Sequence, residues 1–182
     1  MIRVTRRFPS LPYFWSLIDW TLPSLFSSKR SLHRVQNIAD MALVAKKRTP
    51  KVVFDYVAGS AVDEIAYARS RDTFSRIELN SNVLRDVSAI DTSESILGKR
   101  VDLPIAFAPT GYTRLMHHVG EAAVANVAAQ KNLIYALSTM GTTSPAELAI
   151  SVPNSRRWFQ LYIMKNRADT LAVIQQAKEN GF

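Results

Sequence analysis

Three apolar runs of strand length, each followed by a helix-like pattern, constrain this chain more than any other feature. The runs are LPIAFAP (103–109), LIYALSTM (133–140) and WFQLYIM (158–164). Unbroken apolar runs are typical of strands that are buried on both faces, and strands that alternate with helices form parallel sheets. The sequence therefore predicts an α/β fold with three successive βα units.

The helices expected in these units carry start and stop signals. The first, GEAAVANVAAQKN, is rich in alanine, which allows close packing on a sheet. Ser144, Pro145 and Glu147 fit the N-cap, N1 and N3 positions of a capping box at the start of SPAELAIS. Gly181 follows RADTLAVIQQAKEN and fits a helix stop.

Three further helices are expected before the first strand. Their segments are IADMALVAKKR (38–48), KVVFDYVAG (51–59) and DEIAYARSRDTF (63–74). Asn37 fits the N-cap of the first helix, and Thr49-Pro50 ends it because a residue before proline avoids the α region. Gly59 fits the stop of the second helix.

The segment between these helices and the first strand is expected to be irregular. Residues 75–99 are polar and rich in turn-forming residues, and ILGKRVDLP favours a short hairpin around Gly98. Three parallel strands with an open edge are not expected to form a stable domain, because the edge leaves amides and carbonyls unpaired. The chain is therefore expected to be the front part of a larger protein.

Basic residues are concentrated near the N-terminus. The formal net charge is +8, and residues 1–36 contribute five of these charges, from six basic residues and Asp19. This segment also contains the aromatic stretch LPYFWSLIDWTLPSLF, so we treat it as separate from residues 37–182. Three roles stay open for it: contact with a membrane surface, packing on protein, and organelle targeting. The first two roles fit a cytoplasmic protein, with or without contact with a membrane surface. The third fits a mitochondrial protein in a eukaryote.

Composition also limits the class of function. The chain has no cysteine, which excludes disulfides and thiolate metal sites. The basic excess is compatible with a nucleic-acid or anionic-surface binder, but no recognised nucleic-acid module is present. We therefore expect neither a metal site nor a nucleic-acid partner.

Small polar residues follow the predicted strands. They are Pro109-Thr110-Gly111 after the first strand, Ser138-Thr139 at the second, and Gln160 with Tyr162 at the third. In parallel α/β folds the loops after the strands bind the ligand. Uncharged hydrogen-bonding groups, with Gly111 allowing close backbone approach, suit a flat polar heterocycle better than a metal or a bare phosphate.

At these residues the chain resembles a known family. FDYVAGSAVDE, LRDVSAID, APTGYTRLMHHVGE, ALSTMGTTSPAEL and WFQLY are similar to the successive signatures of the FMN-dependent L-2-hydroxy acid oxidases and dehydrogenases. RTPKVVFDY and PTGYTRLMH are most similar to bacterial L-lactate dehydrogenases that pass electrons to quinones. The resemblance implies the N-terminal part of a (β/α)8 TIM barrel, with N-terminal helices and about three βα units, incomplete in this chain.

The resemblance also implies two groups of site residues. FMN would be bound by five residues at strand ends: Pro109, Thr110, Gly111, Ser138 and Gln160. A small 2-hydroxy acid would be oriented by two phenol hydroxyls, those of Tyr56 and Tyr162. Gly111 stands where oxidases usually have alanine, which favours a dehydrogenase. Met140 replaces a bulky aromatic residue of glycolate oxidase, so the size of the substrate stays open.

The family's histidine base, arginines and lysine come from the second half of the barrel, beyond Phe182. We therefore expect the 182-residue chain alone to be inactive and poorly folded, and we assign no catalytic base in it. His117 and His118 are expected to be structural. In the complete protein we expect a quinone or another electron acceptor and a homo-oligomer. The remaining alternative is a non-catalytic half-barrel that needs a partner chain.

Overall fold

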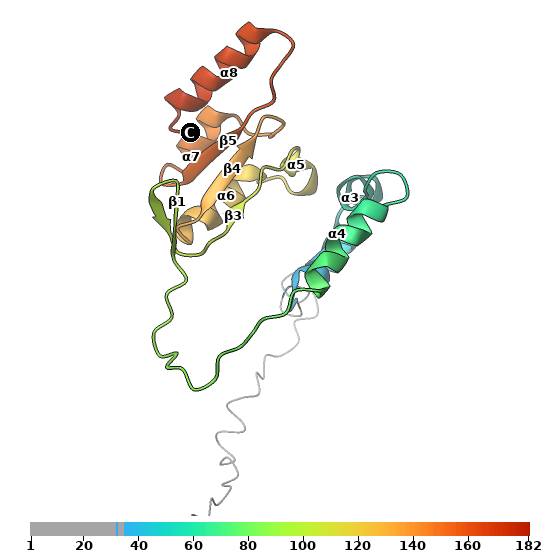
Figure 1. Cartoon of the computed structure of the whole chain (residues 1–182). Coiled ribbons are helices and arrows are strands. Elements are labelled where there is room, and N and C mark those ends of the chain that lie inside the picture. The colour runs from blue at the N-terminus through green and yellow to red at the C-terminus, as the bar shows by residue number, and fades with distance from the viewer. Residues whose placement is uncertain (1–31, 33–34) are drawn as a thin grey trace, which may run out of the picture. The chain divides into compact units, whose positions relative to one another are not determined.

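A computed structural model describes residue 32 and residues 35–182 of the chain (Figure 1). The chain divides into two compact units, Met1–Arg48 and Thr49–Phe182. Residues 1–36 lie almost entirely outside the described residues, so the three roles considered for them stay predictions. The boundary before Asn37 also stays a prediction. Within the described part, no helix has the length and apolar character needed to cross a membrane.

Helix α2 (Ile38–Arg48) has the predicted bounds and the predicted N-cap. The Asn37 Oδ1 accepts a hydrogen bond of 2.9 Å from the Asp40 amide. The Asp40 carboxylate in turn accepts one of 3.1 Å from the Gln36 amide. The first bond satisfies an amide that the start of a helix leaves without a partner, and the second fixes the residue that precedes the N-cap.

Helices α3 (Lys51–Ala58) and α4 (Ile65–Ser75) follow in the second unit. Gly59 ends α3 as predicted, but in an extended conformation with φ −75° rather than a left-handed one. A Cβ at Gly59 would lie 2.7 Å from the Asp55 carbonyl oxygen, so the end of the helix is too tight for a side chain. The third helix begins two residues later than predicted, after Glu64 adopts a left-handed φ of 57°.

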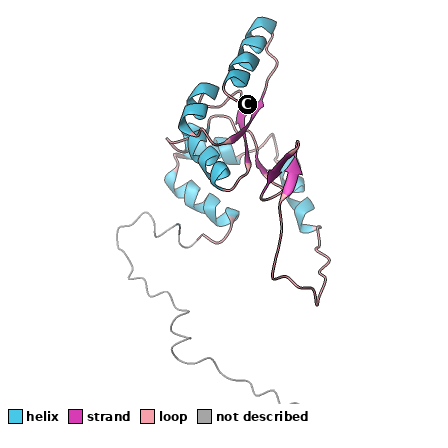
Figure 2. Cartoon of the chain, turned by 90° about the vertical axis from the view of Figure 1, so that its left-hand side faces the viewer, coloured by secondary structure: helices cyan, strands magenta, loops and turns pink. Residues whose placement is uncertain are grey.

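The predicted irregular segment and hairpin are confirmed. Residues 76–93 form neither helix nor strand, and Figure 2 shows them as a long loop between α4 and the hairpin. Strands β1 (Glu94–Ile96) and β2 (Lys99–Val101) pair antiparallel. Leu97 and Gly98 form the turn with φ values of 49° and 73°. Two consecutive positive φ values match the right-handed twist of a two-residue hairpin.

Three parallel strands in the order β3-β4-β5 confirm the predicted βα units. The strands are β3 (Ala106–Phe107), β4 (Ile134–Ser138) and β5 (Arg156–Gln160). The helices are α5 (Thr113–Met116), α6 (Glu121–Gln130), α7 (Pro145–Ser151) and α8 (Arg167–Glu179).

The first and last strands differ from their predicted bounds. Strand β3 has only two residues, and it lies between Pro104 and Pro109, which have no amide to donate to a ladder. Strand β5 begins two residues before the predicted run and ends at Gln160, so Tyr162 lies beyond the strand. The short helix α5 was not predicted.

The core forms between β4 and the helices that follow β3 and β4. Every residue of β4 is buried. The core cluster consists of Ala125, Ala128, Leu133, Tyr135, Leu137, Leu148 and Val152. The two alanines come from α6 and are fully buried, as expected for a helix that packs closely on a sheet. Burial on both faces is nevertheless wrong for the two edge strands. In β3, Ala106 is exposed and Phe107 half-buried, and all residues of β5 are half-buried.

The helices of the second and third units have the predicted caps. The Ser144 Oγ accepts a 3.2 Å hydrogen bond from the Glu147 amide, and the Glu147 carboxylate accepts one of 2.8 Å from the Ser144 amide. This is the capping box at the start of α7. Gly181 follows α8 with φ 74°. Helix α8 therefore stops where a residue without a side chain permits the left-handed conformation.

A buried carboxylate connects the loop after β4 to α6. Glu121, the first residue of α6, is 0% exposed. Its carboxylate accepts hydrogen bonds from the Thr142 amide at 2.6 Å and the Thr142 hydroxyl at 2.7 and 2.8 Å. The Thr143 hydroxyl donates a further bond of 2.8 Å. Arg114 in α5 reaches the same threonine, because its Nη1 donates to the Thr142 carbonyl at 3.2 Å. The loop after β4 is thus held from two helices.

This network changes the acid–base properties of its members. Burial acts to raise the pKa of Glu121, but the hydrogen bonds from Thr142 and Thr143 outweigh it, so the pKa lies below its ordinary value of 4.5. Burial and the charge of Glu121 raise the pKa of Tyr135 to about 12. Glu121 is therefore charged and Tyr135 neutral at physiological pH.

Replacing the N-cap of α7 tests the capping box. Ser144→Ala removes the side-chain acceptor for the Glu147 amide, and we expect the free energy of unfolding to fall by about 1 kcal/mol. Urea unfolding measures this change. Ser81→Ala, in the exposed irregular segment, is the matched control. Equal unfolding midpoints for the two variants would contradict the role of the cap.

The pH dependence of stability tests the Glu121 network. Because the pKa of Glu121 is lowered in the folded state, its stabilisation is present above pH 4.5 and is lost as the pH falls below that value. We expect Glu121→Gln to be less stable than the parent protein at neutral pH, with a difference that shrinks under acidic conditions. Thermal unfolding at several pH values measures it. Glu78→Gln, an exposed carboxylate, serves as control. A difference that is the same at every pH would count against a charged Glu121.

Candidate functional site

A pocket of 540 Å³ lies at the carboxyl ends of the parallel strands, within the unit Thr49–Phe182. Its lining residues are Tyr56, Val57, Pro109, Thr110, Gly111, Tyr112, Ser138, Met140, Gln160 and Tyr162. The volume is in the range of small-molecule and cofactor sites. All seven site residues predicted from the sequence line this one pocket, although they come from four separate segments. Their individual roles toward FMN and substrate stay predictions.

One wall is formed by the loop after β3, which contacts the loop after β4. The Tyr112 amide donates a 3.0 Å hydrogen bond to the Met140 carbonyl. A Cβ at Gly111 would lie 3.1 Å from the Met140 Cβ and 3.4 Å from its carbonyl oxygen. Gly111 thus permits a close approach to its backbone, as predicted. In this structure the residue that approaches it is Met140. Alanine here would require Met140 to shift by a few tenths of an ångström.

The opposite wall is formed by the ends of β4 and β5. The Ser138 Oγ donates to the Gln160 Oε1 at 3.0 Å and accepts from the Met140 amide at 3.1 Å. The Thr139 amide also points to the Gln160 Oε1, at 3.4 Å. These contacts orient the Gln160 amide group, and among the described residues its Nε2 has no acceptor.

This wall fits the polar edge of a flavin. Gln160 lines the pocket, and its Nε2 is a hydrogen-bond donor not used by the described residues, near small groups that leave room for a flat ring. Flavin nitrogens and carbonyls need such donors. The chemistry of the residues present is therefore suitable for FMN, and the predicted contacts of each residue with the ring stay predictions.

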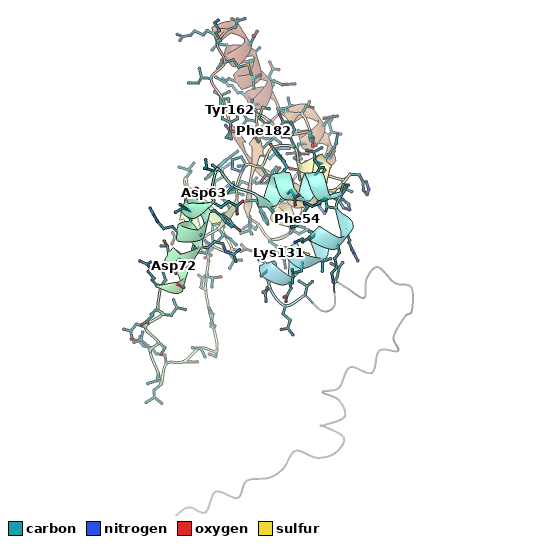
Figure 3. The ribbon with its side chains drawn as sticks, turned by 90° about the vertical axis from the view of Figure 1, so that its right-hand side faces the viewer. Phe54, Asp63, Asp72, Lys131, Tyr162 and Phe182 are labelled. Atoms are coloured by element: carbon teal, nitrogen blue, oxygen red, sulfur yellow. The ribbon has the colours of Figure 1, made fainter. Side chains whose placement is uncertain are left out.

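The two predicted substrate-binding tyrosines approach the pocket from different elements. Tyr56 lies on α3. Tyr162, which is labelled in Figure 3, lies in the segment between β5 and α8. Their side chains are 64% and 56% exposed. Exposed phenols that line a pocket are accessible to a ligand and able to donate hydrogen bonds to a carboxylate or hydroxyl.

Sequence reasoning did not identify all of the pocket residues. Val57 and Tyr112 also line it, and neither was predicted. Val57 is next to Tyr56 on α3. Tyr112 turns toward the pocket through a left-handed φ of 54°, which no pattern of residue types indicated. Thr139 does not line the pocket but bonds to residues that do.

The paired histidines lie outside the pocket. The rings of His117 and His118 stack with centroids 4.4 Å apart, just after α5. The His117 Nδ1 accepts a 3.3 Å hydrogen bond from the Val119 amide. Neither ring lines the pocket, and the structural role expected for the two histidines stays a prediction. In the part of the chain that the structure describes, no group of three or more His, Cys, Asp or Glu residues could hold a metal ion.

Known proteins resemble this chain in sequence. A protein of Mycobacterium tuberculosis named "Putative L-lactate dehydrogenase" is 40% identical over 179 residues, which cover 98% of this chain and 43% of that protein. The glycolate oxidase of Spinacia oleracea is 36% identical over 148 residues, which cover 81% of this chain and 40% of that protein. The chain thus spans about two fifths of the length of these relatives.

Solved structures resemble it in fold. An oxidised, active variant of (S)-mandelate dehydrogenase has a TM-score of 0.78 and 32% identity, covering 82% of this chain and 42% of that one. A mandelate oxidase has a TM-score of 0.74 and 33% identity, covering 79% and 43%. Another mandelate oxidase structure, with a TM-score of 0.73, contains an FMN adduct. These neighbours confirm the predicted fold class, a (β/α)8 barrel that is incomplete in this chain.

A family model described as FMN-dependent dehydrogenase matches residues 45–182. This range includes the pocket, the three parallel strands and all seven predicted site residues. The matched residues, the solved neighbours and the geometry of the pocket agree, and the chain belongs to the FMN-dependent dehydrogenase family.

Proposed function

We propose that this chain supplies the FMN pocket and part of the substrate site of an enzyme that oxidises L-lactate, or a related L-2-hydroxy acid, to the 2-oxo acid. The observation that carries the proposal is the convergence of α3 and three strand ends on one pocket that combines the Gln160 amide donor with two accessible phenols. Lactate is favoured because the relative named for it is 40% identical over 98% of this chain.

Each residue has a task that follows from its chemistry. FMN, when bound, supplies the two-electron acceptor for the oxidation. Pro109, Thr110 and Gly111 offer a small, uncharged surface to its ring. Ser138 holds the Gln160 Oε1, so that the Nε2 is directed to a hydrogen-bond acceptor of the cofactor.

The tyrosines orient the substrate. Tyr56 and Tyr162 donate hydrogen bonds to the carboxylate and hydroxyl of the hydroxy acid, and bonds to a charged acceptor are stronger than bonds to a neutral one. Met140, 41% exposed at the same pocket, leaves room for a small side chain of the substrate. These contacts hold the substrate without transferring its proton.

The proton acceptor is proposed to come from outside residues 1–182. His117 and His118 do not line the pocket, and no carboxylate does so among the described residues. We therefore propose that the 182-residue chain alone does not turn over substrate. The electron acceptor is proposed to be a quinone or another acceptor other than oxygen, because of Gly111. Homo-oligomerisation, a cytoplasmic location and contact of residues 1–36 with a membrane surface belong to the same proposal.

Anaerobic reduction of the flavin tests the reaction. We expect the complete protein, loaded with FMN, to lose its flavin absorbance on addition of L-lactate and to keep it on addition of D-lactate. Glycolate and L-mandelate, added in parallel, compare smaller and larger side chains. Residues 1–182 alone are expected to show no reduction. A holoprotein that no L-2-hydroxy acid reduces would contradict the proposed function, and reduction of the isolated chain would contradict the proposed inactivity.

Replacing each phenol tests the substrate site. Tyr56→Phe and Tyr162→Phe remove one hydroxyl each, and we expect kcat/KM to fall roughly 10- to 100-fold, because a hydrogen bond to a charged group contributes about 1.5–3 kcal/mol. Steady-state kinetics with an artificial electron acceptor measures the effect. Tyr67→Phe is the matched control, since Tyr67 lies on α4 outside the pocket and accepts a bond from Arg71. Wild-type kinetics in both pocket variants would remove these tyrosines from the site.

A further inference from the structure

Thr139 joins the two sides of the pocket without lining it. It follows Ser138, the last residue of β4, and it is half-buried. The paired register of β4 and β5 ends at Ser138 and Gln160. Beyond that pair, Thr139 continues the connection between the two segments through its amide and its hydroxyl.

The hydroxyl of Thr139 both donates and accepts a hydrogen bond. The Oγ1 donates to the Gln160 carbonyl at 2.6 Å and accepts from the Tyr162 amide at 3.1 Å. The Thr139 amide donates to the same Gln160 carbonyl at 3.0 Å. A single hydroxyl therefore bonds to a residue on the proposed flavin side and to one on the proposed substrate side.

The segment that carries Tyr162 has few other attachments. Tyr162 is 56% exposed and Ile163 is 85% exposed. The next hydrogen bond along the described chain runs from the Met164 amide to the Thr170 Oγ1, at 2.9 Å. Between the end of β5 and that bond, the hydroxyl of Thr139 is the acceptor that holds the backbone of Tyr162. The β4–β5 register does not depend on the bond between Tyr162 and Thr139, because the register ends at Ser138 and Gln160.

We propose that Thr139 is a positioning residue that couples the flavin contact of Gln160 to the substrate contact of Tyr162. The proposal rests on the proposed function of the pocket. Thr139 acts through the backbone of its two partners and does not touch the reacting atoms. Its loss is therefore expected to weaken substrate binding more than the chemical step.

The test compares variants that differ in the hydroxyl of residue 139, in the complete FMN-loaded protein. Thr139→Val keeps the shape of the side chain and removes the hydroxyl. We expect KM for L-lactate to rise about tenfold, with kcat changed less than threefold, in line with the loss of about one hydrogen bond of ordinary strength. Thr139→Ser keeps the hydroxyl and should restore KM to within about threefold of the parent value. Thr73→Val on α4, whose hydroxyl donates to the Arg69 carbonyl, is the matched control and should change neither constant.

A double-mutant cycle separates positioning from a general loss of structure. If Thr139 acts through Tyr162, Thr139→Val should have a much smaller effect in the Tyr162→Phe background than in the parent protein. Equal effects in both backgrounds, or an unchanged KM in Thr139→Val, would overturn the proposal. If Thr139→Val yields no folded holoprotein, Thr139→Ala, which removes the same hydroxyl, is measured in its place. The same results would then support or overturn the proposal.

The flavin spectrum without substrate gives an independent result. Thr139→Val removes the Oγ1 bond to the Gln160 carbonyl and leaves the bond from the Thr139 amide. Loss of the Oγ1 bond is expected to shift the visible absorbance of bound FMN, and Thr139→Ser should reverse the shift. This measurement stays decisive even if no L-2-hydroxy acid reduces the protein, so failure of the positioning role and failure of the proposed function are distinguishable. An unshifted spectrum in Thr139→Val would contradict the coupling to Gln160.

Discussion

The pairing of β4 with strands on both sides is the constraint on which the rest of the structure depends. Every residue of β4 is buried, and its parallel registers with β3 and β5 bring three strand ends to the same edge of the sheet. The core packs on β4 through the small side chains of α6 and through Leu148 of α7. Because the ends of β3, β4 and β5 meet at this edge, residues as far apart in the sequence as Pro109 and Tyr162 line one pocket.

Two hydrogen-bond networks then give that edge its shape. On the outer side, the buried carboxylate of Glu121 holds Thr142 and Thr143, and hence the loop that contains Met140. On the inner side, the Thr139 hydroxyl connects the ends of β4 and β5. A buried charge is costly unless several donors satisfy it, and Glu121 has them. The loop after β4 is consequently tied down on both sides of Met140.

Local signals predicted much of this fold. The caps at Asn37 and Ser144, the hairpin around Gly98 and the stop at Gly181 depend on residues within one turn of one another, so the sequence alone was sufficient. The errors have two causes. The exposure of β5 depends on which segments pack on it, which no local pattern shows. The shortness of β3 follows from Pro104 and Pro109, a local signal that was present in the sequence but was not used to set the bounds of the strand.

The pocket, too, was predicted in part from the sequence and decided in part by the tertiary structure. By itself the sequence determined the three βα units, the polar residues at their ends and, through the motifs that include Tyr56 and Gln160, the resemblance to FMN-dependent hydroxy acid enzymes. Only the tertiary structure decided that Gly111 packs on Met140, that Tyr112 turns into the pocket, and that Thr139 and Glu121 hold the loops around it. The physical reason is that residue type and spacing specify local backbone geometry, whereas contacts across the strand ends exist only once the sheet has brought distant segments together.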